Sequence, residues 1–194
     1  MGKETALRIQ KAAISGFKEK GYQSVTIDEI CKLAGITKST FYYHFQSKDQ
    51  LLLDFYKNTI EISAENMQLL ATSENCWQKL WACVEPSIDW TIEADSVIIS
   101  QVLISSIQNS IDIFSKKSGY EELLKIMESI IILGQQTGQF LNTSNAKALV
   151  ENIRCSSIGI ALIWCIEGGS FDKKLAVKKS IISLLCVRED LISK

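Results

Sequence analysis

The stretch of sequence that decides the fold runs from Thr26 to Leu52 and reads TIDEICKLAGITKSTFYYHFQSKDQLL. Its apolar residues recur at helical spacing in two short segments, one on either side of the turn Ala34-Gly35-Ile36. Glycine supplies the positive φ angle that such a tight turn needs. Two short helices joined in this way form a helix-turn-helix, whose second helix can enter the major groove of DNA. The stretch therefore predicts a DNA-binding motif.

The rest of the chain is predicted to be helical as well. A single proline in 194 residues leaves long stretches in which nothing interrupts a helix, although Pro86 itself should end or kink one. Helical spacing, caps and glycines define about nine helical segments: 5–20, 26–35, 38–45, 48–70, 75–92, 96–114, 120–136, 144–167 and 172–192. We predict an all-α fold with an N-terminal three-helix head, residues 1–48, and a larger C-terminal helical body, residues 49–194.

Charge is divided unevenly between these two parts. The whole chain carries 21 basic and 22 acidic side chains, a net charge of −1. Residues 1–48 hold eight basic and four acidic side chains, which leaves 13 basic and 18 acidic ones in the body. A basic head on an acidic body is expected when one end binds a polyanion, although an excess of four charges also arises by chance.

The composition argues against most enzymes. The only histidine is His44, which excludes metal sites built on several imidazoles and catalytic dyads whose base lies elsewhere. The six cysteines include no Cys-x-x-Cys pair, so we predict no metal site and no cofactor. A helical enzyme that uses buried carboxylates stays a formal alternative. No segment is typical of a signal peptide or a membrane span, and we expect a cytoplasmic protein without a membrane partner.

The run from Ala34 to Leu52, AGITKSTFYYHFxxKxxLL, resembles the signature of TetR-type transcriptional regulators. The preceding Thr26-Ile27-x-x-Ile30 and Phe17-x-x-x-Gly21 match it too, so the resemblance covers about residues 5 to 55. It implies an all-α homodimer with a three-helix DNA-binding head. It also implies a variable helical body that binds a small effector, upon which the protein leaves its operator.

The resemblance assigns DNA contacts to individual residues. Three residues with hydroxyl, phenol or ammonium groups would face the DNA backbone and bind its phosphates: Thr26, Tyr42 and Lys48. Such contacts position the protein on the duplex but do not read the base sequence. Other side chains would lie closest to base edges, with Lys38 as the best donor to guanine and a threonine methyl for thymine: Thr37, Lys38, Ser39, Thr40 and Tyr43. His44 would pack at the edge of the interface. Alternatively, the tyrosines are structural aromatics and the lysines are solvated surface charges.

The two late segments 144–167 and 172–192 predict a dimer interface. They are apolar over most of their circumference, so they must be covered on more than one face. The residues expected to meet the partner are Ile153, Ser157, Ile160, Ala161, Trp164, Ile181 and Leu185. A four-helix bundle with the twofold mate would set two recognition helices about 34 Å apart and require a palindromic operator. Burial within a single subunit is the alternative.

An effector pocket is expected between the middle helices, where aromatic residues and two glutamines are concentrated. The candidate lining residues are Trp77, Trp81, Trp90, Gln101, Gln108, Phe114 and Tyr120. Tryptophans at helical spacing also occur in ordinary cores. The sequence as a whole predicts a transcriptional repressor that a small molecule releases from double-stranded DNA. A DNA-binding architectural protein, or a regulator that responds to no ligand, is the alternative.

Overall fold

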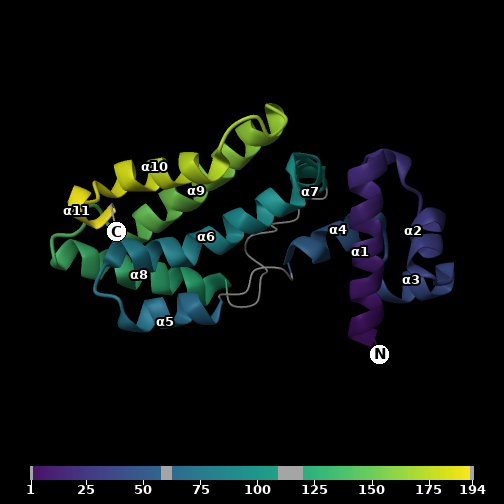
Figure 1. Ribbon diagram of the computed structural model, residues 1–194, viewed down its shortest axis with the longest axis horizontal. Coiled ribbons are helices and arrows are strands. Elements are labelled where there is room, and N and C mark those ends of the chain that lie inside the picture. Colours follow the sequence, from purple (N-terminus) through teal and green to yellow (C-terminus); the bar gives the residue numbers. More distant parts are fainter. Residues whose placement is uncertain (1, 58–62, 109–119, 193–194) are drawn as a thin grey trace. The chain divides into compact units, whose positions relative to one another are not determined.

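The computed structural model describes residues 2–57, 63–108 and 120–192, and within these ranges the secondary structure is helical (Figure 1). An isolated bridge between Phe140 and Val187 is the one β-type pairing in this described part. The elements are α1 (Gly2–Lys20), the 3-10 helix η1 (Tyr22–Ser24), α2 (Ile27–Ala34), α3 (Lys38–His44), α4 (Lys48–Lys57), α5 (Ala64–Thr72), α6 (Cys76–Ala94), α7 (Ser96–Gln108), α8 (Tyr120–Gln136), α9 (Ala146–Ile166), α10 (Lys173–Leu185) and α11 (Glu189–Ile192). The predicted all-α class is confirmed.

The expected number of helices was too low, because two of the predicted segments are each divided. The segment predicted for 48–70 gives α4 and α5, and Ser63 begins α5 by accepting a hydrogen bond from the Asn66 N–H at 3.1 Å. The segment predicted for 172–192 gives α10 and α11, because Cys186 takes a left-handed conformation with φ +49° and ends α10. The described ranges therefore hold eleven α-helices rather than about nine.

Pro86 lies inside α6 and does not end it. A proline has no N–H, so the carbonyl of Ala82, four residues earlier, loses its helical partner. The side-chain amide of Asn66 on α5 donates a hydrogen bond to that carbonyl at 3.2 Å. The pairing replaces the missing bond and allows α6 to continue to Ala94.

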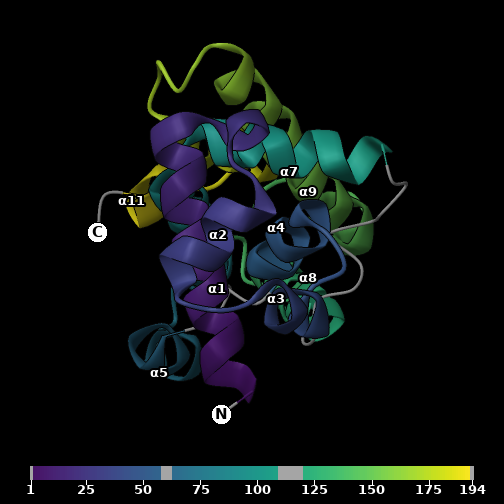
Figure 2. The same cartoon turned by 90° about the vertical axis from the view of Figure 1, so that its right-hand side faces the viewer.

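Contacts divide the chain into two compact units: Met1–Thr59 with Ala94–Lys116, and Ile60–Glu93 with Lys117–Lys194. Helices α4 and α7 thus belong to the same unit as the first three helices, beyond the boundary predicted after residue 48. Figure 2 shows α1 beside α2, and α4 in contact with α7. The core of this unit consists of fully buried apolar side chains, among them Ile9, Phe17, Ile30, Phe41 and Leu51.

The second unit is built around α9, which packs against α8 and α10. Its core combines Leu80 of α6 and Ile131 of α8 with Ile153 and Ile181 of α9 and α10, and with Phe140 from the connection. Lys174 of α10 forms ion pairs with Glu85 and Asp89 of α6 at 2.7 and 2.9 Å. Hydrophobic burial is thus supplemented by charge pairs at the edge of the unit.

Helix α9 is unusually apolar. In the described part of the chain it is the one helix long and apolar enough to cross a membrane by length and composition, with a mean hydropathy of 1.5. Only 22% of the residues in that apolar window are buried within the chain. Much of its surface is therefore left for another apolar partner.

Candidate nucleic-acid interface

Helix α2 begins with a reciprocal cap. The Thr26 hydroxyl accepts a hydrogen bond from the Glu29 N–H at 3.2 Å, and the Glu29 carboxylate accepts one from the Thr26 N–H at 2.9 Å. The helix ends at Gly35, whose φ of +61° is left-handed, and whose N–H donates to the Lys32 carbonyl at 3.3 Å. Local chemistry therefore fixes both ends of α2, and with them the turn.

Helix α3 begins at Lys38, three residues after Gly35, and Thr37 caps it. The Thr37 hydroxyl accepts from the Thr40 N–H at 3.2 Å and forms further bonds with the Ser39 and Thr40 hydroxyls at 2.8 and 2.9 Å. The hydroxyl groups of these short side chains thus form hydrogen bonds with one another. Three of the residues predicted to lie near bases are brought together at the start of one helix, and Thr37 and Ser39 are exposed there.

The two faces of α3 differ sharply. Phe41 and Phe45 face inward with ring centroids 5.9 Å apart, and both are buried. Tyr42 and Tyr43 face outward, with exposed fractions of 54% and 82%. The edge of the His44 ring contacts Tyr43, the ring planes standing at 84°. A large aromatic exposed on a helix next to polar side chains provides a contact surface for a ligand, because leaving it in water is unfavourable.

Lys48 is less free than the sequence suggested. Its ammonium donates hydrogen bonds to the carbonyls of Tyr22 and Val25 at 2.9 and 2.7 Å, and it lies 4.5 Å from the centre of the Tyr22 ring. Burial lowers the pKa of Lys48. The residue therefore ties the start of α4 to the segment before α2, and one of its three N–H groups is left for another acceptor.

Two acidic residues in the first turn of α2 hold lysines. Asp28 binds the ammonium of Lys38 at 2.8 Å, and Glu29 binds that of Lys20 at 3.1 Å. Both pairs are largely exposed to solvent. Lys38, the lysine predicted to contact bases, is thus paired with a carboxylate of the same chain.

The structure contains a polar cluster centred on Asp49 that no feature of the sequence indicated. The Asp49 carboxylate accepts hydrogen bonds from the Tyr22 hydroxyl at 2.8 Å and from the Ser105 hydroxyl of α7 at 2.6 Å. Gln101 donates to Ser105 at 3.2 Å. Burial and the bond to Asp49 raise the pKa of Tyr22. The cluster joins η1, α4 and α7 through bonds that span 27 and 56 residues of sequence, and such spacing carries no local pattern that sequence analysis could detect.

The predicted effector residues do not form one lining. Trp77 and Trp90 are buried in α6, and Trp77 stacks on Trp81 with ring centroids 5.7 Å apart. Gln101 and the exposed Gln108 lie on α7 in the other unit, while Tyr120 begins α8. Phe114 lies outside the described residues. The paired tryptophans belong to the core of the second unit.

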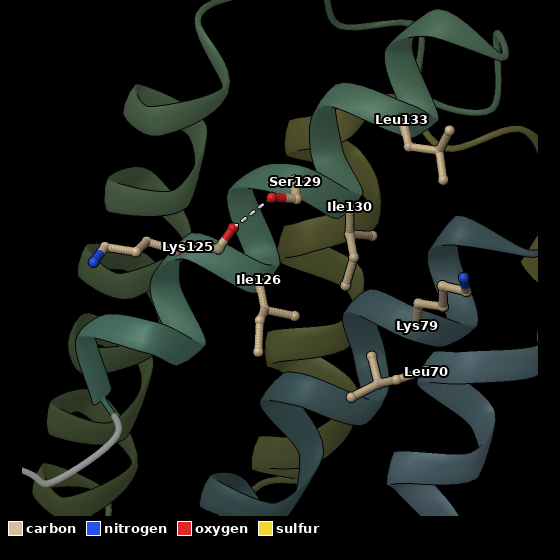
Figure 3. A pocket seen from close by; sticks show the side chains of 7 residues that line it. All are labelled: Leu70, Lys79, Lys125, Ile126, Ser129, Ile130 and Leu133. Carbon is tan, nitrogen blue, oxygen red and sulfur yellow. Dashed lines mark hydrogen bonds between the residues drawn. The ribbon is translucent and has the colours of Figure 1, made fainter.

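A cavity of about 320 Å³ lies elsewhere in the second unit (Figure 3). It is open and mostly apolar, and its lining residues are Leu70, Lys79, Lys125, Ile126, Ser129, Ile130 and Leu133. Figure 3 shows Ile126, Ile130 and Leu133 of α8 facing Leu70 of α5, while Lys125 extends away from them. None of the effector residues predicted from the sequence lines this cavity.

The residues predicted to meet a partner subunit lie mainly inside the chain. Ile153, Trp164, Ile181 and Leu185 are buried, whereas Ser157, Ile160 and Ala161 are partly exposed. The exposed apolar side chains of α9 and α10 are on the other side: Leu162, Ile163, Leu175 and Ile166, the last with an exposed fraction of 75%. No cluster of three or more metal-ligating side chains occurs among the residues that the structure describes.

Comparison with known proteins agrees with this geometry. The family model of bacterial regulatory proteins of the tetR family matches residues 9–55. The Transposon Tn10 TetC protein of Escherichia coli is 29% identical over 150 residues, which span 70% of this chain and 76% of that protein. The family match contains α2, the turn and α3 in full.

Two solved structures share the fold over nearly the whole chain, each with a TM-score of 0.67. Thermus thermophilus FadR, a TetR-family transcriptional repressor in complex with lauroyl-CoA, is 18% identical and aligns over 95% of this chain and 96% of its own. A transcriptional regulator from Saccharomonospora viridis in complex with choline is 22% identical and aligns over 93% and 95%. The fold, the helix-turn-helix with its exposed α3 face and the family match lead to one conclusion: residues 9–55 are a DNA-binding domain of the tetR family, and the chain is a DNA-binding transcriptional regulator.

Proposed function

We propose that this regulator is a cytoplasmic repressor that binds a palindromic operator as a homodimer and leaves it when a small molecule binds. The observation that carries the proposal is the outer face of α3, where Tyr42 and Tyr43 are exposed while Phe41 anchors the helix to the core. In our proposal residues 1–48 form the DNA-binding domain. Residues 49–194 bind the effector and the second subunit.

Each of the predicted DNA contacts has a role in this proposal. Thr26, Tyr42 and the remaining N–H group of Lys48 hold phosphates, which fix the register of the protein on the duplex. Lys38 and Tyr43 lie against base edges in the major groove. The short side chains at the start of α3 and the single imidazole complete the surface: Thr37, Ser39, Thr40 and His44.

The homodimer is supported by the exposed apolar side of α9 and α10. Leu162, Ile163, Ile166 and Leu175 would be removed from water by a second copy of the same helices. The other residues predicted for the interface are the partly exposed Ser157, Ile160 and Ala161 and the buried Ile153, Trp164, Ile181 and Leu185. An apolar α9 is thus accounted for without a membrane.

Effector control is supported by the ligands of the neighbours, lauroyl-CoA and choline. The effector would bind in the second unit, where Trp81 and Tyr120 are partly exposed while Trp77 and Trp90 are buried. The cluster of Tyr22, Asp49 and Ser105 links α7 to the segment before α2. A displacement of α7, which carries Gln101 and Gln108, would therefore disturb the position of the helix-turn-helix.

The proposal is tested by selecting a duplex from a random pool with the purified full chain and measuring its affinity at several salt concentrations. We expect a palindromic site, with affinity that falls steeply as salt rises, and a Lys48→Gln variant whose log–log slope is smaller by about 0.9. Lys32→Gln, which removes an exposed charge elsewhere on α2, is the matched control for changed net charge. Failure to enrich any sequence over random DNA would exclude sequence-specific binding.

Effector control needs a separate measurement. Lauroyl-CoA, choline and a panel of chemically diverse compounds are screened for a rise in melting temperature, and each stabilising compound is then added to the operator complex. We expect at least one compound that raises the melting temperature and dissociates the DNA. Stabilising compounds without release would instead favour a regulator or architectural protein that responds to no ligand.

A further inference from the structure

The acidic side chains at the start of α2 are engaged in different ways. Glu29 closes the cap with Thr26 and also binds Lys20. Among the described residues, the Asp28 carboxylate pairs with the ammonium of Lys38 at 2.8 Å. Asp28 is therefore not needed to begin the helix, and its contact reaches from α2 to the first residue of α3.

Stability does not account for the contact between Asp28 and Lys38. The two side chains have exposed fractions of 65% and 60%, and an ion pair in such surroundings adds little to folding free energy because water and salt screen it. The hydrogen bond to Asp28 raises the pKa of Lys38. The pair places that charge at the start of the candidate recognition helix.

A fixed ammonium and a free one bind DNA differently. A lysine has a flexible four-carbon stem, and a free one can reach whichever phosphate lies nearest, a contact that carries no sequence information. An ammonium held by a carboxylate keeps two N–H donors for other acceptors, such as guanine O6 and N7. It also loses less conformational freedom when it binds, because the stem is already ordered.

We propose that Asp28 is a positioning residue for sequence specificity, which holds the ammonium of Lys38 for base edges and away from phosphates. This inference rests on the proposed role of Lys38 at the bases. Asp28 itself touches no base. Its carboxylate stays paired with Lys38 in the operator complex, which offsets the repulsion that a lone carboxylate would meet beside DNA.

The proposal is tested with a double-mutant cycle in the full chain, Asp28→Asn, Lys38→Gln and the double variant. Each protein is titrated against two duplexes, the palindrome selected from a random pool and a mixed-sequence 30-base-pair duplex, over a series of salt concentrations. Asp28→Glu keeps the carboxylate and serves as the rescue variant. Glu4→Gln removes an exposed carboxylate of α1 and is the matched control for net charge. Circular dichroism verifies that every variant is folded.

For Asp28→Asn we expect affinity for the mixed-sequence duplex to rise about threefold and its salt slope to steepen by about 0.9, because the released lysine neutralises one more phosphate. Affinity for the selected palindrome should fall about threefold, so that discrimination drops about tenfold. Asp28→Glu should restore most of this discrimination. In the Lys38→Gln background, Asp28→Asn should change the discrimination by less than twofold.

Three outcomes would overturn the proposal. Equal gains on both duplexes would mean that Asp28 merely competes with DNA for Lys38. The same loss of discrimination in the Lys38→Gln background would mean that Asp28 acts on DNA without Lys38. If Asp28→Asn loses no more discrimination than Glu4→Gln, Asp28 acts only through the net charge of the protein. Failure of the unmodified protein to select any sequence would be a different result, because it removes the proposed function and the inference with it.

Discussion

The helix-turn-helix and the C-terminal helical unit are held together in different ways. In the former, polar side chains bond to groups three residues away, as Thr26 does with Glu29 and Thr37 with Thr40. In the latter, polar side chains reach across the chain. The Asn75 side-chain amide donates to the Leu191 carbonyl, 116 residues later, and the side-chain amide oxygen of Gln139 accepts from the Cys76 N–H, 63 residues earlier.

The difference explains why one region is recognisable in a sequence and the other is not. Local capping bonds require particular residue types at fixed spacing, so the helix-turn-helix leaves a motif. Packing between distant helices requires only apolar side chains of suitable volume, which many sequences supply. All four tryptophans, residues 77, 81, 90 and 164, lie in the second unit, so tryptophan fluorescence reports on that unit alone.

The largest effect is expected from Phe41→Ala. Phe41 is fully buried between α3 and the rest of its unit, and removal of its ring should lower the free energy of unfolding by about 3–5 kcal/mol. Urea unfolding followed by circular dichroism should show the loss, while the tryptophan fluorescence transition stays in place. Tyr42→Ala, one residue along and exposed, is the control, with a change within about 0.5 kcal/mol. A shift of both transitions together would mean that the two units unfold as one.

Gly134→Ala addresses the packing of the second unit. A Cβ atom at this position of α8 would overlap the ring of Phe140, whose Cγ atom would lie only 2.9 Å away, and Phe140 is itself buried. We expect the free energy of unfolding to fall by about 3 kcal/mol, measured by tryptophan fluorescence in urea.

Gly159→Ala on α9 is the control for this change, because no atom lies within 4 Å of the added Cβ and alanine favours a helix. Gly159→Ala should leave stability unchanged or raise it by about 0.5–1 kcal/mol. Equal effects of the two substitutions would contradict the proposed close contact with Phe140.

Lys173 gives the second unit an expected pH dependence. Its side chain is 3% exposed, donates to the Thr91 hydroxyl at 2.6 Å and lies 3.8 Å from the centre of the Trp164 ring, and burial lowers its pKa to about 8. Between pH 8 and the ordinary lysine pKa near 10.5, the unfolded chain binds more protons than the folded one, so Lys173 makes stability rise with pH. The expected contribution is about 2 kcal/mol between pH 8 and 10.

The contribution of Lys173 to the pH dependence of stability is obtained by comparing the unmodified protein with a variant that lacks this lysine. The comparison is needed because buried thiols change stability with pH in the opposite direction. Burial raises the pKa of Cys83 to about 11, so that residue makes stability fall as the unfolded thiol ionises. Urea unfolding of the unmodified protein and of Lys173→Met is compared from pH 6 to 10 with a reducing agent present. The difference between the two curves should be flat below pH 8 and change above it. A flat difference over the whole range would show that Lys173 is not perturbed.

Thr37→Ala should have the smallest effect, about 1 kcal/mol, because it removes the cap of α3. Thr37→Ser keeps the hydroxyl and is the matched control, with stability close to that of the unmodified protein. The measurement is urea unfolding by circular dichroism, and the fluorescence transition should not move. A loss of similar size in the serine variant would assign the effect to the threonine methyl instead of the cap.

Much of the candidate interface could be predicted from the sequence. Helical spacing and local caps indicated α2, the turn at Gly35 and α3, and the division between buried Phe41 and exposed Tyr43 followed from their positions on one helix. The partners of the lysines could not be predicted in this way. Lys48 binds the Tyr22 and Val25 carbonyls, because the fold brings the start of α4 against η1.

In the C-terminal unit, residue spacing alone is enough to predict the helices and to show that α9 is apolar almost all round. The packing of the helices is needed to establish that Ile153 and Trp164 face the core while Leu162 and Ile166 face outward. Packing also accounts for the burial of Lys173 and for the hydrogen bond that Asn66 supplies at Pro86. The cause of this difference is geometric. Helical periodicity fixes the angles between side chains on one helix, but when every side of the helix is apolar, neighbouring helices determine which side is buried.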